Sequence, residues 1–252
     1  MEPTQAIGLA NFLAQTDTIS RAILCVLLVM SLASWYFIIT KSLALVLARK
    51  KSESFLEAFW NAPSIAAVEK HIEERHPDEP FSHLAWHAIV SSRHHERHGA
   101  NRLNEAGTSA EFLTRAMRRV IDEDTARLES GLTVLASVGS TAPFVGLFGT
   151  VWGVYHALVN IGVSGQGTLD KVAGPVGEAL IMTALGLAVA IPAVLGYNAF
   201  VRSNRLTLSK LDGFAHDLFA VLTTGAHVGE TGAVVPLKPA HGLSRDPAKG
   251  AA

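Results

Sequence analysis

The sequence predicts an all-α, polytopic membrane protein with three transmembrane helices, two of them long and extending into the cytoplasm. The chain is 49% hydrophobic and only 17% charged, with a mean hydropathy of +0.28. This composition favours the membrane class over the soluble globular class. Three stretches, 22–40, 130–169 and 172–201, contain no Asp, Glu, Lys or Arg except Glu178. Because about 20 apolar helical residues cross a bilayer core, each stretch is able to span the membrane.

The first span is expected at 21–41, after a short periplasmic segment at 1–20. We expect no cleavable signal peptide, because "MEPTQAIGLANF" begins with an acid and a proline instead of a basic region. The first span is then the expected insertion signal. Cys25, the single cysteine, lies within it, so the chain can form no intramolecular disulfide.

A cytoplasmic helical domain is expected at 42–130, with helical periodicity interrupted at Pro63, Pro77 and Pro80. Its last stretch, "EFLTRAMRRVIDEDTARLE", has no Pro or Gly before Gly131, so we expect that helix to continue into the second span. The remaining elements are predicted in order: a second span at 131–160, a periplasmic turn at 161–171, a third span at 172–201, a cytoplasmic helix at 202–228 and a disordered tail at 229–252.

Lysine and arginine are distributed unevenly along the chain, which predicts its orientation. Most of them lie between Lys41 and Arg127 or from Arg202 onward, whereas the turn that follows the second span has none before Lys171. The positive-inside rule then places the helical domain and the C-terminus in the cytoplasm, and the N-terminus and the turn outside. The helix at 202–228 carries Leu211, Phe214 and Leu218 at helical spacing, an apolar stripe that needs a partner.

Glu178 is the candidate functional residue, because it places a carboxylate inside the third apolar span. An acid at the centre of a membrane helix costs a few kcal/mol, so it is expected to face protein or water and to mark an ion path. Burial disfavours its charged form, which suits a group that accepts and releases protons. The alternative is a permanently protonated or hydrogen-bonded Glu178 that fixes helix packing.

Small and hydroxyl residues recur at helical spacing in both the second and the third span. Such stripes allow close helix approach in lipid, and the expected packing residues are Gly139, Pro143, Gly146, Gly149, Gly153, Gly186 and Pro192. Thr150 and Thr183 lie on these stripes and suit a hydrated path, although a threonine in a membrane helix also bonds back to the preceding turn. Thr183 lies about 140° around an ideal helix from Glu178, so one helix cannot aim both at the same point. His156, off the stripe, is interpreted as interfacial or as a relay group.

The histidine-rich stretch "HAIVSSRHHERH" is the one further motif with metal-ligating chemistry. It includes His87, His94, His95 and His98, with one pair at i and i+4, but no cysteine or carboxylate stands at an established ligand spacing. We therefore predict no metal and no cofactor, and keep a metal- or pH-sensing histidine module as a weaker hypothesis. A phosphate loop, a nucleophile elbow and a zincin motif are all missing from the sequence, so it does not predict an enzyme.

Two stretches, "STAPFVGLFGTVWGV" (Ser140–Val154) and "AGPVGEALIMTALGLAVAIPAVLGYNAF" (Ala173–Phe200), strongly resemble the ExbB/TolQ branch of the MotA/TolQ/ExbB proton-channel family. The close match covers roughly residues 110–205, favours ExbB over TolQ, and departs from the common family wording at Gly174, Pro175 and Gly177. By motif position, Glu178 corresponds to the family's intramembrane acid, and Thr150 and Thr183 correspond to its pore-lining hydroxyls.

The resemblance implies a multi-pass protein of the bacterial inner membrane that forms a homopentamer around the single-span helices of an ExbD-like partner. Protons are the implied coupling ion. The implied function is to energise a TonB-like protein for outer-membrane import of siderophores or similar cargo, in the manner of ExbB. The alternatives are a TolQ-like subunit that energises a TolA-like protein for envelope integrity and division, and a passive membrane scaffold.

Overall fold

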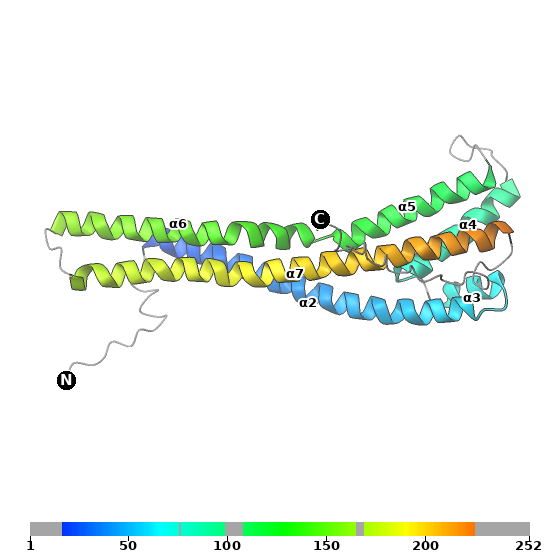
Figure 1. Cartoon of the computed structure of the whole chain (residues 1–252), viewed down its shortest axis with the longest axis horizontal. Helices are drawn as coiled ribbons and strands as arrows, with labels where there is room; N and C mark the ends of the chain where they lie inside the picture. Colours follow the sequence, from blue (N-terminus) through cyan, green and yellow to red (C-terminus); the bar gives the residue numbers. More distant parts are fainter. Residues whose placement is uncertain (1–16, 76, 99–107, 165–168, 225–252) are drawn as a thin grey trace, which may run out of the picture.

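The computed structural model describes residues 17–75, 77–98, 108–164 and 169–224. The tail predicted at 229–252 and nearly all of the N-terminal segment predicted at 1–20 lie outside these ranges. The described chain is all helical, as predicted, and its helices are α2 (Thr18–Trp60), α3 (Ile65–Arg75), α4 (Pro80–His98), α5 (Ser109–Glu129), α6 (Leu132–Ser164) and α7 (Leu169–Thr224). Figure 1 shows an elongated bundle in which α2, α6 and α7 lie along the long axis, with α3, α4 and α5 gathered at one end.

The three predicted spans are confirmed by length and composition. Within the described residues, the helical stretches Thr18–Trp60, Ser109–Val163 and Gly174–Thr224 are long and apolar enough to cross a membrane. The apolar surface of the first span extends beyond its predicted end at residue 41, because Leu43, Val46 and Leu47 on α2 are also exposed. Lys41 does not interrupt this surface, since its side chain is partly buried and donates a hydrogen bond to the carbonyl of Leu128.

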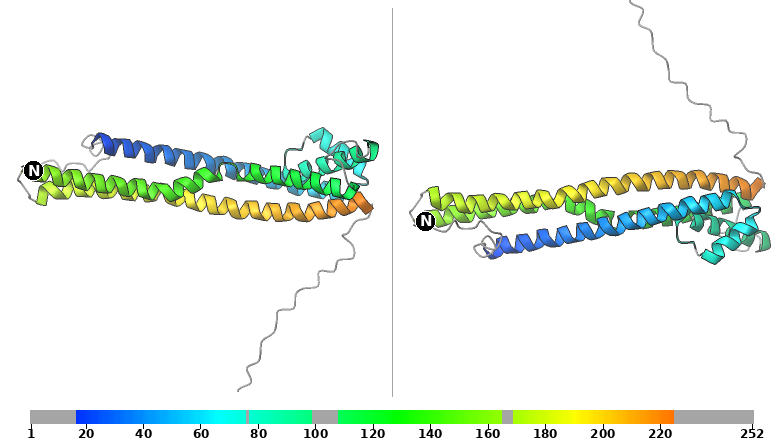
Figure 2. Two further views of the ribbon diagram at one scale, coloured as in Figure 1. Left: turned by 90° about the horizontal axis from the view of Figure 1, so that it is seen from above. Right: turned by 90° about the horizontal axis from the view of Figure 1, so that it is seen from below.

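The second pass is not one continuous helix, which corrects the expectation that the helix at 111–129 runs into the second span. The helix α5 ends at Glu129, Ser130 leaves the helical conformation with ψ 133°, and α6 begins at Leu132. Gly131 adopts a φ of +76°, and a Cβ at this position would lie 2.6 Å from Cε1 of Phe37. Glycine tolerates a positive φ and has no Cβ to overlap with Phe37, so the helix is interrupted at Gly131. The two long continuous helices that extend out of the membrane part are α2 and α7 (Figure 2).

The turn predicted at 161–171 is shorter than expected, because α6 continues to Ser164 and α7 begins at Leu169. Prolines also lie inside the helices, at Pro143 in α6 and at Pro175 and Pro192 in α7. Proline removes one backbone donor without ending a helix that neighbouring helices support.

The extramembrane domain, defined here as α3, α4 and α5 with the C-terminal parts of α2 and α7, has its own apolar core. This core includes Phe55 and Phe59 of α2, Leu84 of α4 and Leu113 of α5, and it buries Leu211, Phe214 and Leu218 of α7. The apolar stripe expected at 202–228 therefore packs on this domain. The core holds the end of α7 in place through aromatic contacts, including Phe214 with Phe59 at 5.0 Å between ring centroids.

Candidate proton pathway

The backbones of α6 and α7 approach each other closely at Gly146 and Gly186. Their Cα positions are so near that a Cβ built on Gly146 would lie 3.0 Å from the Cα of Gly186 and 2.6 Å from the carbonyl oxygen of Met182. A Cβ built on Gly186 would lie 2.7 Å from the carbonyl oxygen of Ala142. Only glycine fits at these two positions without moving a helix, so the pair fixes the α6–α7 spacing.

The other glycines of the stripe also face α7. A Cβ on Gly139 would lie 2.5 Å from Cγ2 of Val194, one on Gly149 would lie 3.0 Å from Cβ of Met182, and one on Gly153 would lie 3.0 Å from Cβ of Ala179. Gly174 and Gly177, where the sequence departs from the common family wording, have no described atom within 4 Å of such a Cβ. The structure thus places the tight packing after Glu178 along α7, toward the centre of the bundle.

Thr150 and Thr183 meet within this tight contact. The hydroxyl of Thr150 lies within hydrogen-bonding distance of the hydroxyl of Thr183, and either can be the donor. Thr150 Oγ1 also donates across the helix pair to the carbonyl of Ala179 at 3.0 Å and lies 3.2 Å from the carbonyl of Gly146 in the preceding turn. Thr150 has one hydroxyl proton and two carbonyl acceptors within reach, so its hydrogen bond can switch between them. An exchangeable hydrogen bond of this kind suits a proton path.

Glu178 is partly buried on α7, one residue before Ala179, whose carbonyl accepts from Thr150. Among the described residues its carboxylate makes no hydrogen bond and no ion pair. The threonine pair and the acid are therefore adjacent along α7 but not bonded to each other, as the angular separation of Glu178 and Thr183 indicated. A carboxylate that has no partner among the described residues is open to contact with water or with groups of another chain.

His156 lies away from this site. Its Nε2 is 3.3 Å from Oδ2 of Asp17, the residue before α2, and its ring stacks at 21° against Trp152 with centroids 6.5 Å apart. Both side chains of this contact are about two-fifths exposed, 42% and 41%. The contact ties the start of α2 to α6, and it does not reach Glu178.

The histidines of α4 do not assemble a metal site in the part of the chain that the structure describes. The side chain of His98 lies outside that part. His87 has its pKa lowered, mainly by burial and next by the neighbouring His83. His95 stacks on Phe112 with ring centroids 5.3 Å apart. These contacts are packing contacts within the extramembrane domain.

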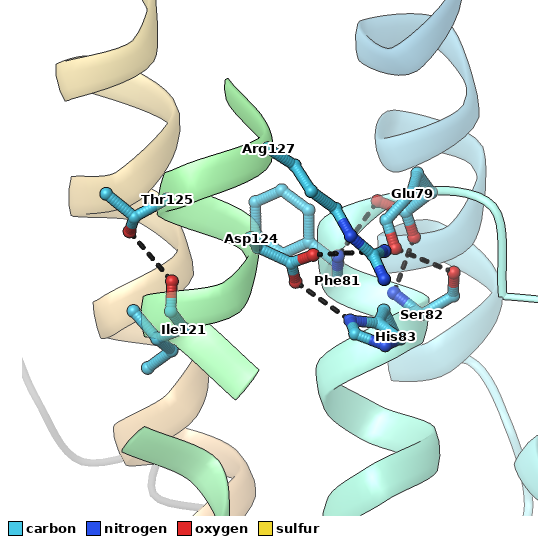
Figure 3. A network of polar contacts seen from close by, with 8 residues as sticks. All are labelled: Glu79, Phe81, Ser82, His83, Ile121, Asp124, Thr125 and Arg127. Carbon is cyan, nitrogen blue, oxygen red and sulfur yellow. Dashed lines mark hydrogen bonds and ion pairs between the residues drawn. The ribbon is translucent and has the colours of Figure 1, made fainter. Parts of the chain in front are cut away.

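Sequence reasoning missed a polar network at the start of α4 (Figure 3). Glu79 accepts hydrogen bonds from the backbone N–H groups of Phe81 and Ser82 and from the hydroxyl of Ser52 on α2, at 3.0, 2.6 and 2.6 Å. An acid directly before a proline is a signature of a helix start, and it could have been read from the pair Glu79–Pro80. Nearby, buried Asp124 of α5 lies 3.0 Å from Nδ1 of His83, a pairing with no local sequence signal.

Comparison with known proteins identifies the family. The model of the MotA/TolQ/ExbB proton channel family matches residues 85–212. The chain belongs to the MotA/TolQ/ExbB family. It is 43% identical over 212 residues to the biopolymer transport protein ExbB of Xanthomonas campestris pv. campestris, covering 83% of this chain and 84% of the relative. It is also 43% identical over 203 residues to ExbB of Neisseria meningitidis, covering 80% and 91%.

The similarity to TolQ is weaker, at 31% identity over 222 residues to the Tol-Pal system protein TolQ of Pseudomonas aeruginosa, covering 87% and 94%. The chain is therefore an ExbB-like, multi-pass membrane subunit of a proton-channel family, and this family is not an enzyme family. The preference for ExbB over TolQ agrees with the sequence motifs. Membership implies proton coupling, and it makes Glu178 the first residue to test.

Proposed function

We propose that this chain is the ExbB-like subunit of a motor driven by the proton-motive force in the bacterial inner membrane. With a single-span ExbD-like partner it energises a TonB-like protein for outer-membrane import of siderophores or similar cargo. The observation that carries the proposal is Glu178, an ionisable side chain in an apolar helix that has no partner among the described residues of its own protomer. The 43% identity to ExbB proteins supports the ExbB role over the TolQ role.

In this proposal Glu178 accepts a proton from the periplasmic side and releases it toward the cytoplasm, while Thr150 and Thr183 supply exchangeable hydrogen bonds beside it. Moving one charge through 100 mV releases about 2.3 kcal/mol, so a few protons suffice to bias a conformational cycle without a nucleotide. The orientation that this requires, with the helical domain and the C-terminus in the cytoplasm, rests on the distribution of Lys and Arg.

Assembly is part of the proposal, because the membrane part of the protomer leaves apolar side chains uncovered. Phe144, Leu147 and Phe148 on α6 are each at least half exposed, and Leu180 and Leu195 on α7 are also exposed. These surfaces suit contacts with further copies of the chain, with the ExbD-like helices or with lipid. We expect a homopentamer in which Glu178 lies beside the central partner helices.

The test is iron–siderophore uptake in cells whose only ExbB-like protein is this chain, co-expressed with an ExbD-like protein. Wild type is compared with Glu178→Gln at equal membrane abundance, together with proton flux in vesicles that contain the purified complex. Glu129→Gln is the matched control, because it makes the same change at an exposed acid just outside the second span. Loss of uptake and flux in Glu178→Gln alone, with the complex intact, supports the motor.

Two other outcomes point elsewhere. If Glu178→Gln keeps both uptake and flux, the residue is structural and the chain acts as a passive scaffold. If wild type fails to support uptake but restores the detergent resistance of a strain lacking TolQ, the TolQ-like role is correct. The 31% identity to TolQ across 94% of that relative is the observation that keeps this second role in view.

A further inference from the structure

The three long helices leave the membrane part in different ways, and this difference carries a mechanical consequence. The helices α2 and α7 run unbroken from the membrane part into the extramembrane domain, whereas the second pass is interrupted between α5 and α6. Figure 2 shows the interruption as the one visible offset along the second pass. A movement of α7 is therefore passed directly into the domain, but a movement of α6 has to cross the break.

The backbone carbonyls at the end of α5 show how the break is held. Ser130 serves two of them, donating its N–H to Ala126 at 3.1 Å and its hydroxyl to Arg127 at 2.8 Å. The next carbonyl, that of Leu128, is served from outside the helix by Lys41 Nζ of α2 at 2.9 Å and by Asn204 Nδ2 of α7 at 2.8 Å. Helix ends leave such carbonyls without intrahelical partners, and here both continuous helices supply the donors.

The position of these donors is specific. Asn204 is 7% exposed and Lys41 is partly buried, so neither hydrogen bond is formed by a fully exposed surface side chain. Both line a groove of about 440 Å³ that is formed by α2, α5, α7 and the start of α4, and the exposed Lys210 lines it too. Gly131, the second of the two residues between α5 and α6, has φ +76° and lies so close to Phe37 of α2 that an added Cβ would be 2.6 Å from Cε1 of that ring.

We propose that Lys41 and Asn204 are positioning residues that clamp the end of α5 to α2 and α7, so that the extramembrane domain follows α7 although the second pass is interrupted at Gly131. This inference rests on the proposed proton-driven function. The α6–α7 contact at Gly146 and Gly186 packs the two helices closely together, so we expect a change beside Glu178 to move them as a pair. Asn204 lies about 30 Å along α7 from Thr183, at the point where α7 enters the extramembrane domain.

The clamp predicts that its loss uncouples proton flux from siderophore uptake. In Lys41→Met and Asn204→Leu, proton flux in vesicles stays within about twofold of wild type, while iron–siderophore uptake at equal membrane abundance falls about tenfold. Lys41→Arg keeps the charge-assisted donors and retains most of the uptake. Lys210→Met removes a lysine from the same groove without touching Leu128, and it behaves as wild type.

A distance measurement between α5 and α7 tests the clamp directly, including in variants that assemble poorly. Spin labels at exposed Ala126 of α5 and Arg202 of α7, in a Cys25→Ala background, report the α5–α7 distance by pulsed electron paramagnetic resonance. We expect one narrow distribution in wild type and a broad one in Asn204→Leu, with no change between labels at Ser140 of α6 and Leu195 of α7.

The outcomes separate the two proposals. If Glu178→Gln abolishes flux but the clamp variants keep both the narrow α5–α7 distance and full uptake, the clamp is refuted and the motor stands. If the clamp variants lose flux and uptake in equal proportion, their role is structural and the clamp is again refuted. If Glu178→Gln leaves flux intact, the motor itself fails.

Discussion

Replacing Gly146 by alanine should force α6 and α7 apart. The added Cβ would lie 2.6 Å from the carbonyl oxygen of Met182, whereas close C···O contacts between helices are about 3.3 Å, so the helices need to separate by about 0.7 Å. Along that direction the Thr150–Ala179 hydrogen bond, now 3.0 Å, stretches to about 3.7 Å and is lost.

The expected cost combines overpacking, about 1–3 kcal/mol, with one lost hydrogen bond, about 1 kcal/mol. The higher helix propensity of alanine offsets up to about 1 kcal/mol of this loss in stability. A net loss of about 2 kcal/mol corresponds to a fall of about 4–8 °C in the apparent melting temperature of a domain of this size. The reciprocal Gly186→Ala, whose Cβ would lie 2.7 Å from the carbonyl of Ala142, should behave alike.

The assay is thermal unfolding of the purified complex in one detergent, followed by size-exclusion chromatography after heating. Gly213→Ala is the matched control, because it lies on α7 with no described atom within 4 Å of the added Cβ. It should melt at the wild-type temperature or above. Equal melting temperatures for Gly146→Ala and Gly213→Ala would show that the α6–α7 spacing is not set by these glycines, and the reasoning would be wrong.

Three further predictions concern the extramembrane domain and the helix break. Asp124→Ala leaves the buried ring of His83 unpaired and should destabilise the domain by about 1–3 kcal/mol, seen as faster amide hydrogen exchange in α4 and α5. Burial lowers the pKa of His87 below its ordinary 6.5, so the unfolded chain takes up a proton first and stability falls as the pH drops below about 6.5; chemical unfolding of His87→Gln should show a flatter pH profile. Gly131→Ala forces an L-residue into φ +76° against the ring of Phe37 and should lower the melting temperature, with partial recovery in the double variant with Phe37→Ala, because only the overlap is relieved.

Properties that depend on neighbours along the chain could be predicted from the sequence. The three spans follow from long stretches without charge, and the glycine stripe of α6 follows from spacings of three and four residues that hold in any helix. The apolar stripe on the last helix could also be predicted, since Leu211, Phe214 and Leu218 repeat on one face. In each case the physical cause lies within one continuous stretch of the chain.

The features that the sequence did not reveal depend on residues far apart in the chain. The break at Gly131 is stabilised by Phe37 of α2, and no local signal distinguishes this glycine from those that stay helical, such as Gly146. Likewise, the sequence places Lys41 at the charged end of the first span, but in the structure its ammonium group donates a hydrogen bond to the carbonyl of Leu128. The meeting of Thr150 with Thr183 required knowing the register of α6 against α7, which the tight glycine contacts set.

The polar interactions of the chain differ between its two halves, and this difference bears on the proposed function. In the extramembrane domain the buried charges are compensated locally, Asp124 by His83 and Glu79 by Ser52 and the start of α4. In the membrane part, Glu178 has no such partner among the described residues. Because an unpaired acid in a membrane helix costs a few kcal/mol, we expect the carboxylate of Glu178 to be stabilised by another chain, by water or by a proton. We therefore expect the proposed proton pathway to be complete, and its chemistry to appear, only in an assembled complex.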